Sequence, residues 1–140
     1  MVATALLFAL KIYFAANLDL FGDGAFYWLE SRQLAFAYSD LPPATALMIR
    51  ASAMLLGDNP FGVRFLFICI AALPPLLVWY WADDLYSTTE ATGAAALTLA
   101  VPLAASLGVL AVPDVLQVTV GLGAFMAFER ATRAGTHSLG

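Results

Sequence analysis

Charged side chains are scarce in this sequence. Only 11% of its 140 residues are charged, whereas soluble domains average about 25%. Six Lys and Arg residues stand against ten Asp and Glu residues, which gives a net charge of −4. Because nucleic-acid binding needs a basic face, this balance argues against a nucleic-acid partner.

Cysteine and histidine are nearly absent as well. Cys69 is the single cysteine and His137 the single histidine. One cysteine excludes an internal disulfide and a zinc site built from several cysteines. Cys69 lies in an apolar run, where a free thiol packs as a small hydrophobe. A metal site needs several convergent ligands, so the sequence predicts neither a metal nor a cofactor.

Apolar residues, in contrast, make up 62% of the chain, against about 45–50% in soluble domains. This excess predicts a membrane protein that interacts with the lipid bilayer. The predicted fold class is all-α: a multi-pass transmembrane helical bundle of about four spans plus two interfacial helices.

The spans are predicted near residues 2–17, 63–81, 91–110 and 114–130. A hydrocarbon core about 30 Å thick needs about 20 helical residues, so the apolar stretch after residue 90 is too long for one span. Gly108 and Pro113-Asp114 supply the turn between its two halves. Pro74-Pro75 is expected to kink the second span.

A polar loop, residues 18–62, separates the first two spans. Two short helices are predicted within it, over 23–38 and 44–56. The first is rich in the aromatic residues that favour the headgroup level of a bilayer. The second is bounded by Pro42-Pro43 and Gly57, which are typical helix punctuation. Both are expected to lie at the membrane interface.

Five short motifs occur in a fixed order along the chain. They are Asp-x-x-x-Tyr-Trp at 23–28, Tyr-x-Asp-x-Pro-Pro at 38–43, Gly-Asp at 57–58, Phe-Gly-Val-Arg at 61–64 and Pro-Asp at 113–114. This set resembles the GT-C-fold membrane glycosyltransferases, above all glycosyltransferase family 39 (the protein mannosyltransferases) and the aminoarabinose transferase group. Since family members are several times longer, the resemblance implies that residues 1–140 are an N-terminal fragment, inactive on its own.

The resemblance implies an inverting transferase. Such an enzyme moves a sugar from a polyprenyl-phosphate donor to an acceptor hydroxyl on a protein, lipid or glycan. It also implies a multi-pass protein of the plasma or inner membrane, with the loop 18–62 on the extracytoplasmic face.

By the same resemblance, Asp23 is the general base. An acceptor hydroxyl is a weak nucleophile, and a positioned carboxylate that takes its proton contributes about 10²–10⁴-fold. The alternative is that Asp23 only caps a helix that starts at residue 24. Asp40 either orients Asp23 or a substrate hydroxyl, or is a turn residue.

The remaining candidates concern substrate binding. Tyr27, Trp28 and Tyr38 either stack on a sugar or prenyl chain or belong to the interfacial aromatic belt. Because phosphate favours a bidentate guanidinium, Arg50 and Arg64 are candidates for the carrier phosphate. Asp114 is a further substrate-binding candidate. The alternative roles are a membrane anchor for Arg64 and a helix N-cap for Asp114. Glu30 and Arg32 are interpreted as interfacial, solvated side chains.

Two further functions compete with the transferase. One is a non-catalytic four-span scaffold or assembly subunit whose partner face is a small-residue stripe, formed by Ala96, Ala100, Ala104 and Gly108. The other is a transporter fragment with Lys11 and Asp114 as charges on a pathway.

Overall fold

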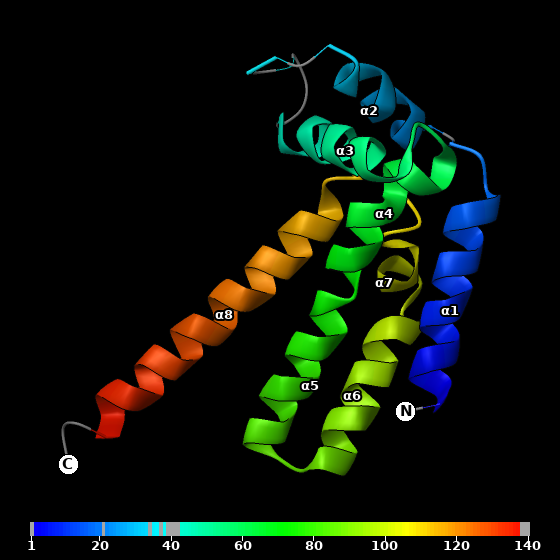
Figure 1. Cartoon of the computed structure of the whole chain (residues 1–140). Helices are drawn as coiled ribbons and strands as arrows, with labels where there is room; N and C mark the ends of the chain where they lie inside the picture. The colour runs from blue at the N-terminus through cyan, green and yellow to red at the C-terminus, as the bar shows by residue number, and fades with distance from the viewer. Residues whose placement is uncertain (1, 21, 34, 37, 39–42, 138–140) are drawn as a thin grey trace.

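The computed structural model describes residues 2–20, 22–33, 35–36, 38 and 43–137 (Figure 1). Within these ranges the chain is helical and contains no strand, which confirms the predicted all-α class. Asp40 lies outside the described residues, so its role stays a prediction. The helices are α1 (Val2–Asn17), α2 (Asp23–Ser31), α3 (Pro43–Leu56), α4 (Pro60–Ala71), α5 (Leu73–Leu85), α6 (Thr88–Ala100), α7 (Pro102–Ser106) and α8 (Asp114–His137).

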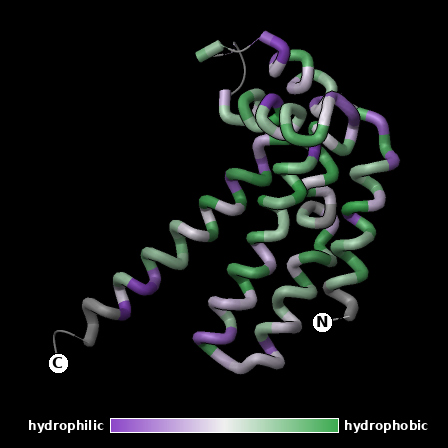
Figure 2. Tube along the Cα trace, viewed as in Figure 1, coloured by the Kyte–Doolittle hydropathy of each residue, from purple (hydrophilic) through white to green (hydrophobic). Residues whose placement is uncertain are grey.

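The upright helices α1, α4, α5 and α6 form a bundle, and α2 and α3 lie across its upper end in Figure 1. We call α2, α3 and residues 57–59 the cap. Helix α8 starts beneath the cap and slants away from the bundle. Figure 2 shows hydrophilic residues gathered in the cap and at the opposite end of the bundle, with mostly hydrophobic residues between.

Helices α4 and α5 form one long apolar rod, Pro60–Leu85. In the described chain it is the only helix whose length and hydropathy suffice to cross a bilayer. Its 26 residues extend about 39 Å, more than a hydrocarbon core of about 30 Å. The rod is interrupted at Ala72, just before Pro74 and Pro75, which lack the N–H groups needed to continue the helical hydrogen bonds. The other predicted spans stay predictions.

The helix predicted near 91–110 is shorter than expected, because α6 ends at Ala100. Val101 is extended (φ −64°, ψ 126°), the conformation that a residue before proline prefers, and Pro102 starts the separate helix α7. The small-residue stripe is therefore not a continuous helix face, and that prediction is wrong. The buried face of α6 consists instead of Ala91, Ala95 and Leu99.

The helix predicted over 23–38 also ends early, at Ser31. The side chain of Tyr38 returns to this end of the helix. Its hydroxyl lies 3.1 Å from the Glu30 carbonyl oxygen and 3.0 Å from that of Gln33, and it accepts the Ala35 N–H at 3.2 Å. Tyr38 therefore adds one hydrogen-bond donor, shared by two carbonyl oxygens, at the end of α2.

The hydrophobic core lies where the cap meets the bundle and the start of α8. It consists of Tyr27, Ile49, Val63, Phe67, Ala71, Leu107, Ala111 and Val115. Gly108 makes the close approach of the α7–α8 connection to α4 possible. Its φ is +88°, and a Cβ there would lie 2.8 Å from the Cβ of Ala71. The core therefore fixes the position of α2 relative to the long rod.

Lys11 on α1 joins the bundle to the α7–α8 connection. Its side chain is buried, and its ammonium group donates hydrogen bonds to the carbonyl oxygens of Ala104 at 2.6 Å and Leu107 at 3.1 Å. Ala104 lies in α7, and Leu107 follows directly after that helix. Lys11 therefore links α1 to the backbone in and after α7.

Candidate functional site

Asp23 opens α2 and is exposed. The residue at the N-cap position is Gly22, with φ +54°, and no side chain forms a capping hydrogen bond there. The alternative that Asp23 is the cap is therefore wrong. Among the described residues the Asp23 carboxylate has no hydrogen-bond or ion-pair partner, which leaves it accessible to a substrate.

Tyr27 lies one helical turn after Asp23 and packs in the same core cluster as Val115 of α8. Burial raises the pKa of the Tyr27 phenol, and the negative charges of Asp23, Asp114 and Glu30 raise it further. Asp114 is the exposed first residue of α8, and its negative charge acts on the same phenol as that of Asp23. Tyr27 itself is only 6% exposed and lies within this core.

A second polar group lies on the other side of α2, around Asp58. The Trp28 indole N–H donates to Asp58 Oδ1 at 2.6 Å, and the guanidinium of Arg32 pairs with Asp58 Oδ2. Arg32 also stacks on Trp28, with 5.3 Å between its Cζ and the ring centroid. This Trp28–Arg32–Asp58 triad fastens α2 to the α3–α4 connection.

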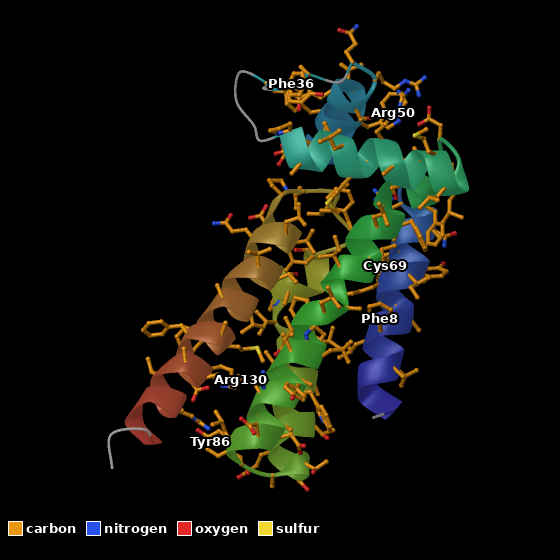
Figure 3. The ribbon with its side chains drawn as sticks, turned by 60° about the vertical axis from the view of Figure 1, so that its left-hand side comes forward. Phe8, Phe36, Arg50, Cys69, Tyr86 and Arg130 are labelled. Carbon is orange, nitrogen blue, oxygen red and sulfur yellow. The ribbon has the colours of Figure 1, made fainter. Side chains whose placement is uncertain are left out.

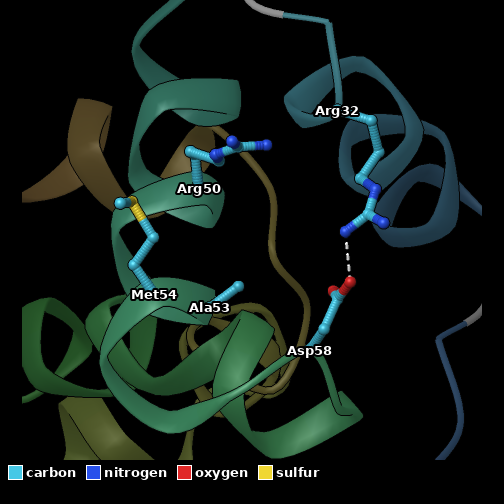
Figure 4. A pocket seen from close by; sticks show the side chains of 5 residues that line it. All are labelled: Arg32, Arg50, Ala53, Met54 and Asp58. Carbon is cyan, nitrogen blue, oxygen red and sulfur yellow. Dashed lines mark hydrogen bonds and ion pairs between the residues drawn. The ribbon is translucent and has the colours of Figure 1, made fainter.

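Two hollows adjoin the triad. The first, about 400 Å³, is lined by Arg32, Arg50, Ala53, Met54 and Asp58 (Figure 4). The second, about 290 Å³, is more apolar and is lined by Leu20, Ala25, Trp28, Asp58, Asn59, Pro60 and Val63. Asp58 borders both, so the triad forms the wall between a charged and an apolar hollow.

Arg64 lies apart from both hollows. It is 3% exposed, and its guanidinium donates to the carbonyl oxygens of Ala15 at 2.9 Å and Asp19 at 2.7 Å, and to that of Leu18. These carbonyls lie at and after the end of α1. The guanidinium is therefore engaged by the backbone, which does not favour its predicted phosphate role.

Sequence reasoning treated Arg32 as a solvated side chain and gave Asp58 no chemical role. The available signals were the Gly57-Asp58 motif and the spacing of four between Trp28 and Arg32, which places both on one helix face. Tyr27, Trp28 and Tyr38 have structural partners here, and their predicted contacts with a substrate remain predictions. Among the described residues no group of three His, Cys, Asp or Glu side chains is arranged to hold a metal ion.

These observations define a helical protein in which a polar cap with accessible carboxylates covers one end of a membrane-length helix. The model of the dolichyl-phosphate-mannose-protein mannosyltransferase family matches residues 40–139. The chain belongs to this family of membrane-associated glycosyltransferases, which confirms the resemblance noted in its motifs. No curated protein and no solved structure matches the chain. The matched range includes Arg50, Asp58 and Asp114 but begins after α2.

Proposed function

We propose that this chain transfers a sugar from a polyprenyl-phosphate donor to an acceptor hydroxyl on the extracytoplasmic face of the membrane, with Asp23 as the general base. The observation that carries the proposal is the position of the exposed Asp23 carboxylate. It lies one helical turn before the buried Tyr27, in the cap of a chain that belongs to a mannosyltransferase family.

In the proposed reaction the acceptor oxygen attacks the anomeric carbon of the donor sugar. A carbon–oxygen bond forms as the bond to the phosphate oxygen breaks, and polyprenyl phosphate leaves with the bonding electron pair. Asp23 takes the proton of the acceptor hydroxyl. Positive charge develops on the sugar ring in the transition state, and general base catalysis of this kind contributes about 10²–10⁴-fold.

Asp114 is proposed to orient the acceptor or a sugar hydroxyl at the same place. Its carboxylate and that of Asp23 both act on Tyr27 although they come from helices far apart in the sequence. The two carboxylates provide acceptors for substrate hydroxyl groups. The core contact of Tyr27 holds α2 at the position that this arrangement requires.

The test measures transfer of labelled sugar from a polyprenyl-phosphate donor by membranes that contain the full-length protein. Asp23→Asn keeps the size of the side chain and removes its basicity, so we expect a loss of about 10²–10⁴-fold in rate. Asp19→Asn is the matched control, because Asp19 is another exposed carboxylate near α2, and we expect its rate to equal that of the parent.

Two results contradict the proposal. An unchanged rate for Asp23→Asn, at equal expression, moves the base to another residue. No transfer by the parent from any polyprenyl-phosphate sugar favours the non-catalytic scaffold instead.

A further inference from the structure

The hollow between α2 and α3 has an unbalanced charge. Arg32 and Arg50 contribute two positive charges to its lining, and Asp58 contributes one negative charge. Asp58 is already engaged, since its two oxygens accept from Trp28 and Arg32. The hollow therefore keeps one excess positive charge, and we call it the basic pocket.

Arg50 is the unpaired cation of the basic pocket. It lies on α3, is exposed, and has no hydrogen-bond or ion-pair partner among the described residues. Figure 4 shows its side chain extending over Ala53 toward Arg32. Arg32 is held in place by Asp58 and by the Trp28 ring. Two guanidinium groups therefore border the same space, one fixed and one available.

A phosphate group fits this lining better than a carboxylate. It offers three acceptor oxygens and up to two negative charges, enough to accept from both arginines at once. Guanidinium groups bind phosphate oxygens in pairs, with a geometry that an ammonium group does not match. The volume of about 400 Å³ accommodates such a group together with part of what it is attached to.

The surroundings of the basic pocket indicate that the phosphate belongs to a lipid. Asp58 lies two residues before the start of the apolar rod Pro60–Leu85, at the level where lipid phosphates border the hydrocarbon core. Large apolar side chains are exposed on the same two helices: Leu29 is 63% exposed, Met54 76% and Leu55 64%. Apolar surface beside a basic pocket suits an amphiphile rather than free phosphate.

We propose that the basic pocket binds the phosphate group of a membrane lipid through Arg32 and Arg50, while Asp58 holds Arg32 in place. The binding does not depend on transfer.

The test uses the full-length protein in a neutral detergent and three probes. They are a short-chain phosphatidic acid, the diacylglycerol with the same acyl chains, and inorganic phosphate. We expect phosphatidic acid to bind at least tenfold more tightly than either of the others, and less tightly as salt rises. Arg50→Gln should weaken its binding by about tenfold to a hundredfold, the range for losing hydrogen bonds to a charged group.

Matched variants make the test specific. Arg130→Gln removes an exposed arginine at the opposite end of the molecule (Figure 3) and should leave binding unchanged. Arg50→Lys, which keeps the charge without the paired donors, should fall between the parent and Arg50→Gln. Equal binding of phosphatidic acid and diacylglycerol overturns the proposal, as does unchanged binding by Arg50→Gln with normal helix content. Equal binding of inorganic phosphate overturns the assignment to a lipid.

The two proposals fail separately. Asp23→Asn should bind phosphatidic acid as the parent does, because Asp23 does not line the basic pocket. If phosphatidic acid binding depends on Arg50 but the protein transfers no sugar, only the proposed function is overturned. If transfer depends on Asp23 but Arg50→Gln leaves phosphatidic acid binding unchanged, only the basic-pocket proposal is overturned.

Discussion

The cations of the bundle and those of the cap have different partners. In the bundle, Lys11 and Arg64 are buried and donate to backbone carbonyls of distant segments. In the cap, Arg32 pairs with a half-exposed carboxylate, and Arg50 borders an open pocket. Buried charges must be satisfied within the protein, whereas exposed ones need not be. The difference teaches that a cation near a membrane helix is not by itself a ligand site; the partner of its side chain decides.

Removal of Arg64 should have the largest effect on stability. In Arg64→Met three carbonyl groups around the end of α1 lose their donors, and we expect the free energy of unfolding to fall by about 3–5 kcal/mol. Denaturant unfolding in a mild detergent measures the change. Arg50→Met is the control and should stay within about 0.5 kcal/mol of the parent. Equal losses in the two variants would show that cap and bundle cations do not differ.

Removal of Lys11 should have the next largest effect. Lys11→Met keeps most of the apolar stem and removes the hydrogen-bond donor to the carbonyls of Ala104 in α7 and of Leu107 after it. We expect a loss of about 2–3 kcal/mol in the same unfolding experiment. Leu10→Met, at a half-exposed neighbour on α1, serves as the control. A stability equal to that of the parent would mean that the connection finds other donors.

Changes at Asp58 should be smaller, because an exposed ion pair contributes about 1 kcal/mol or less. Asp58→Ala removes the acceptor of both Trp28 and Arg32, whereas Asp58→Asn keeps an acceptor for Trp28. Hydrogen exchange of the Arg32 and Gln33 amides, which close the end of α2, should accelerate severalfold in Asp58→Ala and less in Asp58→Asn. Unchanged exchange rates in both variants would show that the triad does not stabilise the end of α2.

The smallest effect concerns Tyr27 and high pH. Since its pKa is raised in the folded protein by burial and then by nearby carboxylates, the unfolded chain releases this proton first. Stability is therefore unaffected below the ordinary tyrosine pKa of about 10 and falls as pH rises above it. Tyr27→Phe should flatten this part of the pH profile, measured from pH 9 to 11, and Tyr86→Phe, an exposed control, should not. If the stability profiles of Tyr27→Phe and Tyr86→Phe have the same pH dependence, the raised pKa of Tyr27 is contradicted.

Local signals in the sequence predicted the local structure well. The helix predicted over 44–56 is α3, because proline residues precede it and Gly57, with φ +88°, follows it. The turn at Pro113-Asp114 precedes α8 as predicted. Pro102 carried the signal for the end of α6 and was overlooked. The end of α2 was not predictable in this way, because no glycine or proline follows Ser31 directly; the hydroxyl of Tyr38 returns to the helix there.

The partners of the cations were beyond sequence reasoning for a physical reason. Lys11 and Arg64 bind backbone carbonyls, which every residue possesses, so no residue type marks the partner. Arg32 and Asp58 are 26 positions apart, and their pairing depends on how α2 lies across α3. Tyr27 and Val115 likewise share one core cluster only because the cap lies over the start of α8. The sequence identified candidate residues from their residue types. Which of them lie close together is determined by the tertiary structure.

The hydrogen bonds of Lys11 also set an order of events during synthesis. Their acceptors lie 93 and 96 residues further along the chain. At about 5–20 residues per second, the ribosome needs about 5–20 s to make that intervening stretch. During this interval the ammonium group of Lys11 has to be hydrated or bound by another partner. A helix made before the rest of the bundle is thus among the last to be completed.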